Sequence, residues 1–261
     1  MNEAAIREAA EQLLAARRDM RLLPGLPERC RPRTPDEAYA IQESFLRFWG
    51  GGVAGWKIGA TSAEALRMLA LDDPFYGPVF SPVVMRSPAE TAAAKYSMRA
   101  IECEFAFRLG DDLPARGRPY GREEVAEAIQ SLIPAIELID TRYDSFTNYG
   151  GIALIADCGA NGGLVLGEEL TDWRRIDLPA HRVALDVDAE RKAEGTGKIV
   201  LGSPLEALFW LVGERVRRGA GLRAGEVITT GTCTGLTLMA PDQTAVTDFG
   251  ELGKVQVRFV Q

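Results

Sequence analysis

Three glutamates in two apolar segments have the residue type and spacing of a metal site. Glu102 and Glu104 lie two positions apart in the alternating segment IECEFAF, so on a strand both side chains point to one face. Glu137 lies in a second apolar run, PAIELID. Buried carboxylates are costly unless a cation compensates them, and a hard divalent cation such as Mg²⁺ or Mn²⁺ prefers oxygen ligands. A solvent-facing strand with exposed glutamates is the equally open alternative.

Lys57, in the segment GWKIGATS, is the second residue that could take part in chemistry. It lies among apolar and glycine positions, where a solvated lysine is not expected. A desolvated ammonium group near carboxylates or a metal-bound anion can serve as an acid, a base or a charge stabiliser. Taken alone, Lys57 is more typical of an exposed edge strand. Its interest therefore depends on the glutamates.

The histidine content excludes several reaction classes. The only histidine is His181, in the loop-like segment DLPAHRV. Ser-His-Asp hydrolysis, Cys-His proteolysis and a histidine-rich metal site would all have to use this one imidazole. We expect His181 to be an exposed or structural residue and the acid–base groups to be carboxylates, a lysine, a tyrosine or a metal-bound water.

Composition points to an ordinary globular protein. The chain has 261 residues, of which 46% are hydrophobic, enough for a substantial core. Thirty basic and 37 acidic residues give a net charge of -7 without a basic stripe, so we expect no nucleic-acid partner. The four cysteines form no C-x-x-C pair, which disfavours a zinc cluster or a disulfide framework.

The first twenty residues and the apolar runs bear on location. The segment MNEAAIREAAEQLLAARRDM is charged throughout and lacks the apolar core of a signal peptide. No apolar stretch approaches the roughly 18 residues of a membrane span. We therefore expect a cytoplasmic protein with no membrane partner.

Helical patterns mark the beginning of the chain and two later segments. Apolar residues recur at helical spacing from about residue 2 to 18, and a second helix is predicted in RTPDEAYAIQESFLRFW, with Thr34 as N-cap and Glu37 closing a capping box. Further helices are predicted at about 122–132 and after a second capping box at Ser203 and Glu206.

The rest of the chain consists of short apolar runs separated by glycine and proline. The predicted strands lie in VAGWKIGA, YGPVFSPVVM, IECEFAFRL, IPAIELID, IALIADCG, GLVLG, RVALDVDA, EVITTG and KVQVRFV. Such strands with few regular β–α alternations favour an α+β fold with a largely antiparallel, β-rich core. We expect a helical region at residues 1–50 as an annex to a β-rich catalytic domain at 51–261, with GDDLPARGRPYG as a surface loop.

Several of these motifs, taken in order, resemble one enzyme family. GWKIGATS, DDPFYGPVF, IECEFAF, PAIELIDTRY, ADCGANGGLVLG, GSPLEALFWLV and AGEVITTG follow one another as in the 2-keto-4-pentenoate hydratases of the fumarylacetoacetate hydrolase superfamily. The resemblance covers the chain from about residue 30 to its end. It implies a divalent Mg²⁺ or Mn²⁺ held by Glu102, Glu104 and Glu137, a functional lysine at Lys57, the β-rich fold of the superfamily and a homo-oligomer.

The resemblance also implies a substrate and a reaction. A 2-hydroxy-2,4-dienoate or 2-oxo-enoate from the catabolism of aromatic carbon would chelate the metal, and water would add at C4 after proton transfer. Lys57 would transfer protons or offset substrate charge. On the same basis Asp73 is a candidate catalytic acid, and the candidate substrate-binding residues are Tyr76, Gly77, Asn161 and Thr230.

Two departures from the family pattern leave other reactions open. The turn usually written P-D-Y-G or P-D-F-G has Phe75 in place of the acid, with Asp73 two residues earlier as a weak substitute. The usual D-N-A-S or D-N-A-A stretch reads Asp157-Cys158-Gly159-Ala160. The alternatives are decarboxylation of the 4-oxalocrotonate type, C–C hydrolysis of an acylpyruvate and, more remotely, a non-catalytic binding protein.

Overall fold

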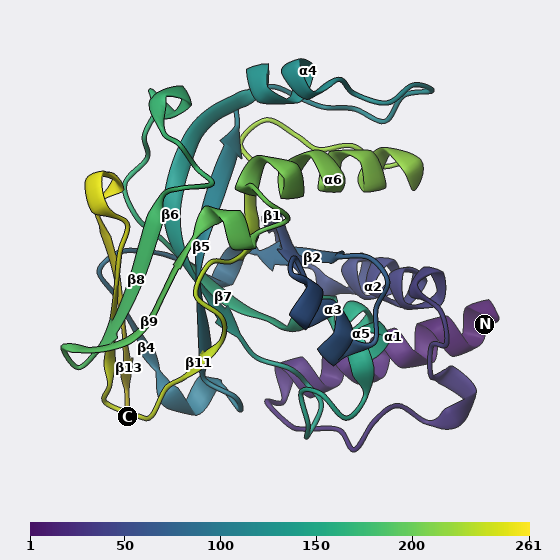
Figure 1. Cartoon of the computed structure of the whole chain (residues 1–261). Coiled ribbons are helices and arrows are strands. Elements are labelled where there is room, and N and C mark those ends of the chain that lie inside the picture. Colours follow the sequence, from purple (N-terminus) through teal and green to yellow (C-terminus); the bar gives the residue numbers. More distant parts are fainter.

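Two sheets and six α-helices make up the fold. The structure is a computed structural model that describes all 261 residues (Figure 1). The helices are α1 (Glu3–Arg18), α2 (Pro35–Trp49), α3 (Ala63–Leu69), α4 (Arg122–Glu127), α5 (Gly150–Ala156) and α6 (Pro204–Arg217). The larger sheet contains β1 (Val53–Gly59), β2 (Phe75–Phe80), β3 (Val84–Arg86), β5 (Ala100–Leu109), β6 (Ile129–Ile139), β7 (Asn161–Leu166), β10 (Val227–Thr232) and β11 (Thr237–Leu238). The smaller sheet contains β4 (Ala89–Ala92), β8 (Arg182–Val187), β9 (Glu190–Thr196), β12 (Thr244–Asp248) and β13 (Lys254–Val260).

The order of strands confirms the predicted fold class. The larger sheet runs β2-β1-β10-β5-β6-β7-β3, with β11 added to β5, and the smaller sheet runs β4-β13-β12-β8-β9. Only the pairs β1–β10, β13–β4 and β3–β7 are parallel; all others are antiparallel. The protein is therefore α+β with a largely antiparallel core.

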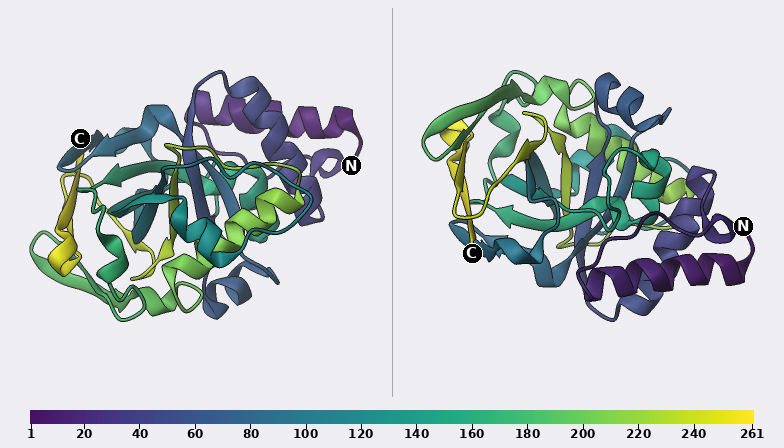
Figure 2. Two further views of the ribbon diagram at one scale, coloured as in Figure 1. Left: turned by 90° about the horizontal axis from the view of Figure 1, so that it is seen from above. Right: turned by 90° about the horizontal axis from the view of Figure 1, so that it is seen from below.

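The helices of residues 1–50 lie at one end of the molecule, opposite the smaller sheet (Figure 2). α2 packs against α1 on one side and against α5 on the other. Buried residues of α1 and α2, such as Leu13 and Phe45, belong to the same hydrophobic cluster as Phe105 and Phe107 of β5. Each fully buried side chain of this size stabilises the fold by about 1.5–3 kcal/mol, so this core joins the helical end to the sheets.

The structure contains both predicted helix starts but not the capping boxes predicted there. The Thr34 hydroxyl accepts from the Glu37 N–H at 3.2 Å, while the Glu37 carboxylate accepts from the Arg33 N–H at 2.8 Å. The Ser203 hydroxyl accepts from the Leu205 N–H at 3.3 Å. Neither glutamate bonds back to its cap; Glu206 pairs with Arg122 of α4 instead. Both helices start where predicted, but neither capping box is closed.

Two predicted elements need correction, and one helix was not predicted. The helix expected at 122–132 ends at Glu127, because the following residues Ile129–Ile139 form β6 and pair with β5 along its length. The expected strand IALIADCG is helix α5, whose apolar residues are buried on several sides; periodicity cannot separate such a run from a buried strand. Helix α3 was not predicted. It begins at Ser62, whose hydroxyl accepts from the Ala65 N–H.

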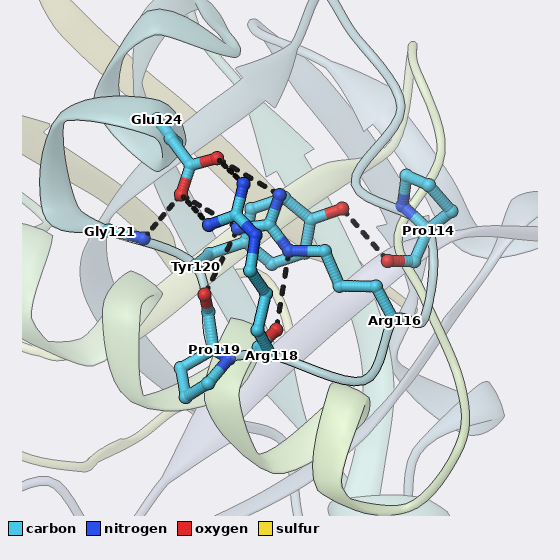
Figure 3. A network of polar contacts seen from close by, with 7 residues as sticks. All are labelled: Pro114, Arg116, Arg118, Pro119, Tyr120, Gly121 and Glu124. Carbon is cyan, nitrogen blue, oxygen red and sulfur yellow. Dashed lines mark hydrogen bonds and ion pairs between the residues drawn. The ribbon is translucent and has the colours of Figure 1, made fainter.

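The segment GDDLPARGRPYG is a loop between β5 and α4, as expected, and polar contacts fix its end (Figure 3). Arg116 and Arg118 both pair with Glu124, with N–O distances of 2.7 and 3.2 Å. The same carboxylate accepts from the Gly121 N–H at 2.7 Å, and the Tyr120 hydroxyl donates to the Pro114 carbonyl at 2.8 Å. Glu124 therefore ties the loop to the first turn of α4.

None of the six helices combines the length and the apolar character that a membrane crossing requires.

Candidate metal centre and adjoining cavity

Adjacent strands bring the three glutamates together. Glu102 of β5 and Glu137 of β6 are direct cross-strand partners, and Glu104 lies two residues further along the same face of β5. One carboxylate oxygen from each residue lies within 4.8 Å of one from each of the others. The expected alternation of IECEFAF and the expected strand around Glu137 thus converge on one cluster.

The cluster is not on a solvated face. Glu104 and Glu137 have no exposed surface, and Glu102 is partly buried. On the same face, the sheet continues as a small apolar cluster that contains Ala106, Ala135 and Leu164. One oxygen of Glu104 and both oxygens of Glu137 have no hydrogen-bond partner. The solvent-facing alternative for these glutamates is therefore wrong.

Burial and mutual repulsion disfavour ionisation of the carboxylates in the protein alone. Burial raises the pKa of Glu102 to about 7, with Lys57 opposing the shift and Glu137 adding to it. Burial also raises the pKa of Glu104 well above its usual range, reinforced by Glu137 and Glu102. For Glu137 burial again raises the pKa, although Lys57 counteracts it. A hard divalent cation bound here would stabilise the ionised form of these crowded carboxylates.

Lys57 lies beside this cluster rather than on an edge strand. Strand β1 runs between β2 and β10, and the Lys57 side chain is almost fully buried. Its ammonium is 3.3 Å from a Glu137 oxygen. Burial alone would lower the pKa of Lys57, but the charges of Glu137, Glu102 and Glu104 outweigh it and raise the pKa. Lys57 is thus held as a cation.

A cavity of about 310 Å³ opens onto Lys57 and Glu102. Lys57 is the only basic residue in its lining, and the only carboxylates are Glu102 and Glu64. Polar groups near Thr61, Ser62 and Thr232 share the wall with an apolar set, which comprises Ile58, Ala60, Ala65, Met68, Leu69, Phe75, Ile139, Phe146, Leu154 and Leu236. Its size is at the low end of the roughly 300–1,000 Å³ typical of small-molecule sites.

The two departures from the family pattern both reach this cavity, as expected. Phe75 and Gly159 line it, and the Phe75 ring centre is 5.4 Å from the Lys57 ammonium. Gly159 has a φ of +68°, and a side chain there would meet both Lys57 and the backbone of Gly77. An aromatic ring therefore stands at the position where an acid was expected.

Asp73 does not reach the cavity. It is exposed and lines a separate surface pocket together with Tyr39 and Arg218. Its position does not support the prediction that Asp73 substitutes for the missing acid, because the bend that contains Asp73, just before Pro74 and Phe75, places it at the surface. His181 is likewise outside the lining, and its ring nitrogen is 2.7 Å from the Phe249 carbonyl.

The predicted substrate-binding residues Tyr76 and Gly77 lie next to the cavity without lining it. Because side chains alternate along β2, Tyr76 points away from Phe75; it stacks on Tyr39, with ring centres 4.5 Å apart. Gly77 is packed so closely that a side chain would meet the Cys158 carbonyl. Neither contributes a side chain to the cavity, and the assignment of Tyr76 is corrected on this ground.

Asn161 and Thr230 are also outside the lining. The Thr230 hydroxyl donates to the Phe105 carbonyl at 2.8 Å, a contact that does not support the predicted substrate-binding role. Asn161 is fully buried. Its backbone carbonyl accepts from Arg17 at 2.8 Å, and its side-chain nitrogen has no hydrogen-bond partner. A direct substrate contact by Asn161 is therefore not supported by its position.

Two groups that the sequence reasoning missed belong to the site. Helix α3 supplies Ser62, Glu64 and Met68 to the cavity wall. The Gly231 N–H donates to a Glu104 oxygen at 2.8 Å, which fixes that carboxylate. The serine N-cap pattern at Ser62 is a signal that could have predicted α3. No sequence signal ties Gly231 to Glu104, since the bond depends on the pairing of β10 with β5.

Comparison with known families decides the relationship. The family model for the fumarylacetoacetate hydrolase C-terminal region matches residues 57–260, which include Lys57 and all three glutamates. The chain belongs to the fumarylacetoacetate hydrolase family. The predicted resemblance is thereby confirmed.

Its relatives include 2-keto-4-pentenoate hydratases and a 4-oxalocrotonate decarboxylase. The chain is 34% identical to 2-keto-4-pentenoate hydratase 1 of Dechloromonas aromatica over 86% of each chain, and 32% identical to hydratase 2 of that organism over 97% of each. The structure of 4-oxalocrotonate decarboxylase from Pseudomonas putida G7, complexed with magnesium and adipate, matches with a TM-score of 0.92 at 25% identity. That match covers 100% of this chain and 99% of the other.

Proposed function

We propose that the protein is a divalent-metal-dependent hydratase that adds water to a 2-hydroxy-2,4-dienoate carrying one carboxylate. Relatives named as hydratases are 34% and 32% identical to it over most of their length, and the glutamate cluster and Lys57 lie beside a cavity of suitable size. The two Dechloromonas aromatica relatives are named for the same reaction. A homo-oligomer stays a prediction.

Glu102, Glu104 and Glu137 would hold the metal, and the observation that fits it is that Oε1 of Glu104 and Oε1 of Glu137 are buried without a hydrogen-bond partner. The magnesium in the decarboxylase structure and the manganese in a fumarylpyruvate hydrolase structure support a choice of Mg²⁺ or Mn²⁺. When bound, such an ion acts as a Lewis acid that stabilises negative charge on the substrate's 2-oxygen.

Lys57 would bind substrate charge. Its ammonium group lines the cavity and is the only cation there, so it is the group that can pair with a substrate carboxylate or with charge that develops on the enolate. Because Glu137 holds Lys57 as a cation, we assign it charge stabilisation and proton donation rather than proton abstraction.

The apolar wall is the observation that favours hydration over decarboxylation of the 4-oxalocrotonate type. That substrate carries a second carboxylate at its far end, which would need a cation or several donors when buried. Beyond Lys57 the cavity has no basic residue, and much of its wall is formed by side chains such as Met68, Phe75 and Phe146. A substrate with an uncharged end fits this lining better.

A direct comparison of substrates tests the proposal. Magnesium-loaded protein is incubated with 2-hydroxypenta-2,4-dienoate and, separately, with 4-oxalocrotonate, while dienol absorbance and CO₂ release are followed. We expect loss of the dienol with formation of the hydrated 2-oxo acid, and no CO₂ from the dicarboxylate. Release of CO₂ without hydration of the monocarboxylate would establish the decarboxylase alternative. Turnover of neither substrate would favour an acylpyruvate or another compound.

Glu64 is the group to which we assign activation of the water. It is the only carboxylate in the cavity lining outside the metal set, and a carboxylate there is placed to accept a proton from a water beside the substrate. Glu64→Gln is expected to lower kcat by about 10²–10⁴-fold, the usual contribution of a general base, with little change in magnesium affinity. Kinetics and metal titration of this variant, beside Glu168→Gln at an exposed site away from the cavity, check it. An unchanged kcat would remove Glu64 from the mechanism.

A further inference from the structure

A second cavity, of about 350 Å³, has five cations among its 14 lining residues. Arg17, Arg18 and Arg21 of the α1 end, together with Lys95 and Arg142, face a single carboxylate, Asp140. The whole chain has a net charge of -7, so this concentration of positive charge runs against its average. The cavity shares no residue with the one beside the metal cluster.

The two least exposed cations of this cavity, Arg17 and Arg142, have one carboxylate partner between them, Asp140. Arg17 forms no ion pair; its guanidinium donates to the Asn161 carbonyl at 2.8 Å and lies 4.3 Å from the centre of the Phe80 ring. Arg142 is 6% exposed and uses Asp140, 2.9 Å away. Asp140 also accepts from the Met98 N–H at 2.7 Å, so its capacity is already shared.

Burial makes this arrangement costly without an anion. Burial and the nearby charge of Arg142 together lower the pKa of Arg17 to about 10, although Asp157 and Asp140 act in the opposite direction. A guanidinium has five N–H donors in a planar fork, and Arg17 uses one of them in a direct hydrogen bond. Unused donors on a buried cation match the oxygens of phosphate and carboxylate groups.

We propose that this cavity binds a small multivalent oxyanion, either a phosphate or a dicarboxylate, between Arg17 and Arg142 at its floor and Arg18, Arg21 and Lys95 at its rim. The last three residues are exposed and make only weak contacts: Arg21 is 3.9 Å from Asp19, and Arg18 donates to the Phe48 carbonyl at 3.3 Å. They are therefore free to turn toward a ligand. The site does not depend on the proposed hydratase activity.

The cavity lies close to the metal centre along the chain. Ile139 lines the cavity beside the metal cluster, and the next residue, Asp140, lines the cationic one. Arg142 is also tied to that region, since its N–H donates to Asp157 at 2.7 Å and Asp157 begins the turn that carries Gly159. The two sites are thus separate but share the ends of β6 and the turn before β7.

Calorimetric titration of the magnesium-loaded full-length protein tests the proposal. Inorganic phosphate and succinate are titrated separately at constant ionic strength set with chloride, so that one arm reports the phosphate type and the other the dicarboxylate type. Arg18→Ala and Lys95→Ala are each expected to weaken binding about tenfold, as expected for loss of one charged donor. Arg258→Ala, an exposed cation outside the cavity, is the control and should bind as the unmodified protein does.

Thermal unfolding gives an independent readout. A bound anion raises the unfolding midpoint of the unmodified protein, and the double variant Arg18→Ala/Lys95→Ala should lose that rise while keeping its midpoint in chloride. Binding of either anion with this pattern supports the site. Absence of binding by both anions, or equal affinity in the cavity variants and in Arg258→Ala, overturns it.

Discussion

Glu104→Gln is expected to abolish hydratase activity and to weaken divalent-metal binding by at least about 100-fold. Loss of a group that only orients a metal ligand costs 10–100-fold, and Glu104 is assigned as a ligand itself. The substitution is nearly isosteric, and the amide oxygen can still accept from the Gly231 N–H. Only the charge and one acceptor oxygen are removed, so the result reports the electrostatics of the site rather than its shape.

The measurements for Glu104→Gln are magnesium affinity, turnover and unfolding in denaturant. Removing a buried charge that has no hydrogen-bonded partner at Oε1 should leave the metal-free protein as stable as the unmodified one, or more so. Glu168→Gln, at an exposed position, is the matched control and should change none of the three. Unaltered magnesium affinity in Glu104→Gln would refute the ligand assignment.

Lys57→Met is expected to lower kcat by about 10²–10⁴-fold, the usual contribution of a proton-transfer group, while magnesium binding persists. Methionine keeps most of the length of the buried stem and removes the ammonium that lies 3.3 Å from Glu137. Since the lysine competes with a metal ion for the same carboxylate charge, its loss should leave magnesium affinity equal or higher. Opposite effects on turnover and metal affinity distinguish Lys57 from the ligands.

Controls for Lys57→Met separate charge from packing. Lys198→Met removes an exposed lysine outside the cavity lining and should keep full activity. Equal loss of magnesium binding and turnover in Lys57→Met would show that the lysine holds the cluster together instead of acting on substrate. Normal turnover would exclude it from the reaction.

The metal cluster was predictable because it depends on local alternation and on charge. Glu102 and Glu104 had to share a face once IECEFAF was a strand, and the cost of burying them with Glu137 implied a cation. Their register was not predictable: only the pairing of β5 with β6 sets Glu102 opposite Glu137. The apolar run around Glu137 indicated it as the third ligand, and the family resemblance implied the same set.

The surroundings of the site were harder to predict because they depend on which way a strand faces and on unrecognised helices. Tyr76 neighbours Phe75 in sequence, yet alternation along β2 turns it toward Tyr39. Asp73 precedes the strand and lies at the surface. Helix α3 contributes Glu64; its seven residues carry too little periodicity to identify it, so the N-cap serine Ser62 was the available signal.

The unequal burial of the three carboxylates determines how the site is reached. Glu104 and Glu137 have no exposed surface, and Glu102 is the only glutamate of the cluster that lines the cavity. An ion held by the three glutamates would therefore share the cavity's opening with the substrate. Because a substrate that fills the cavity would cover this route, we expect metal exchange to slow while substrate is bound.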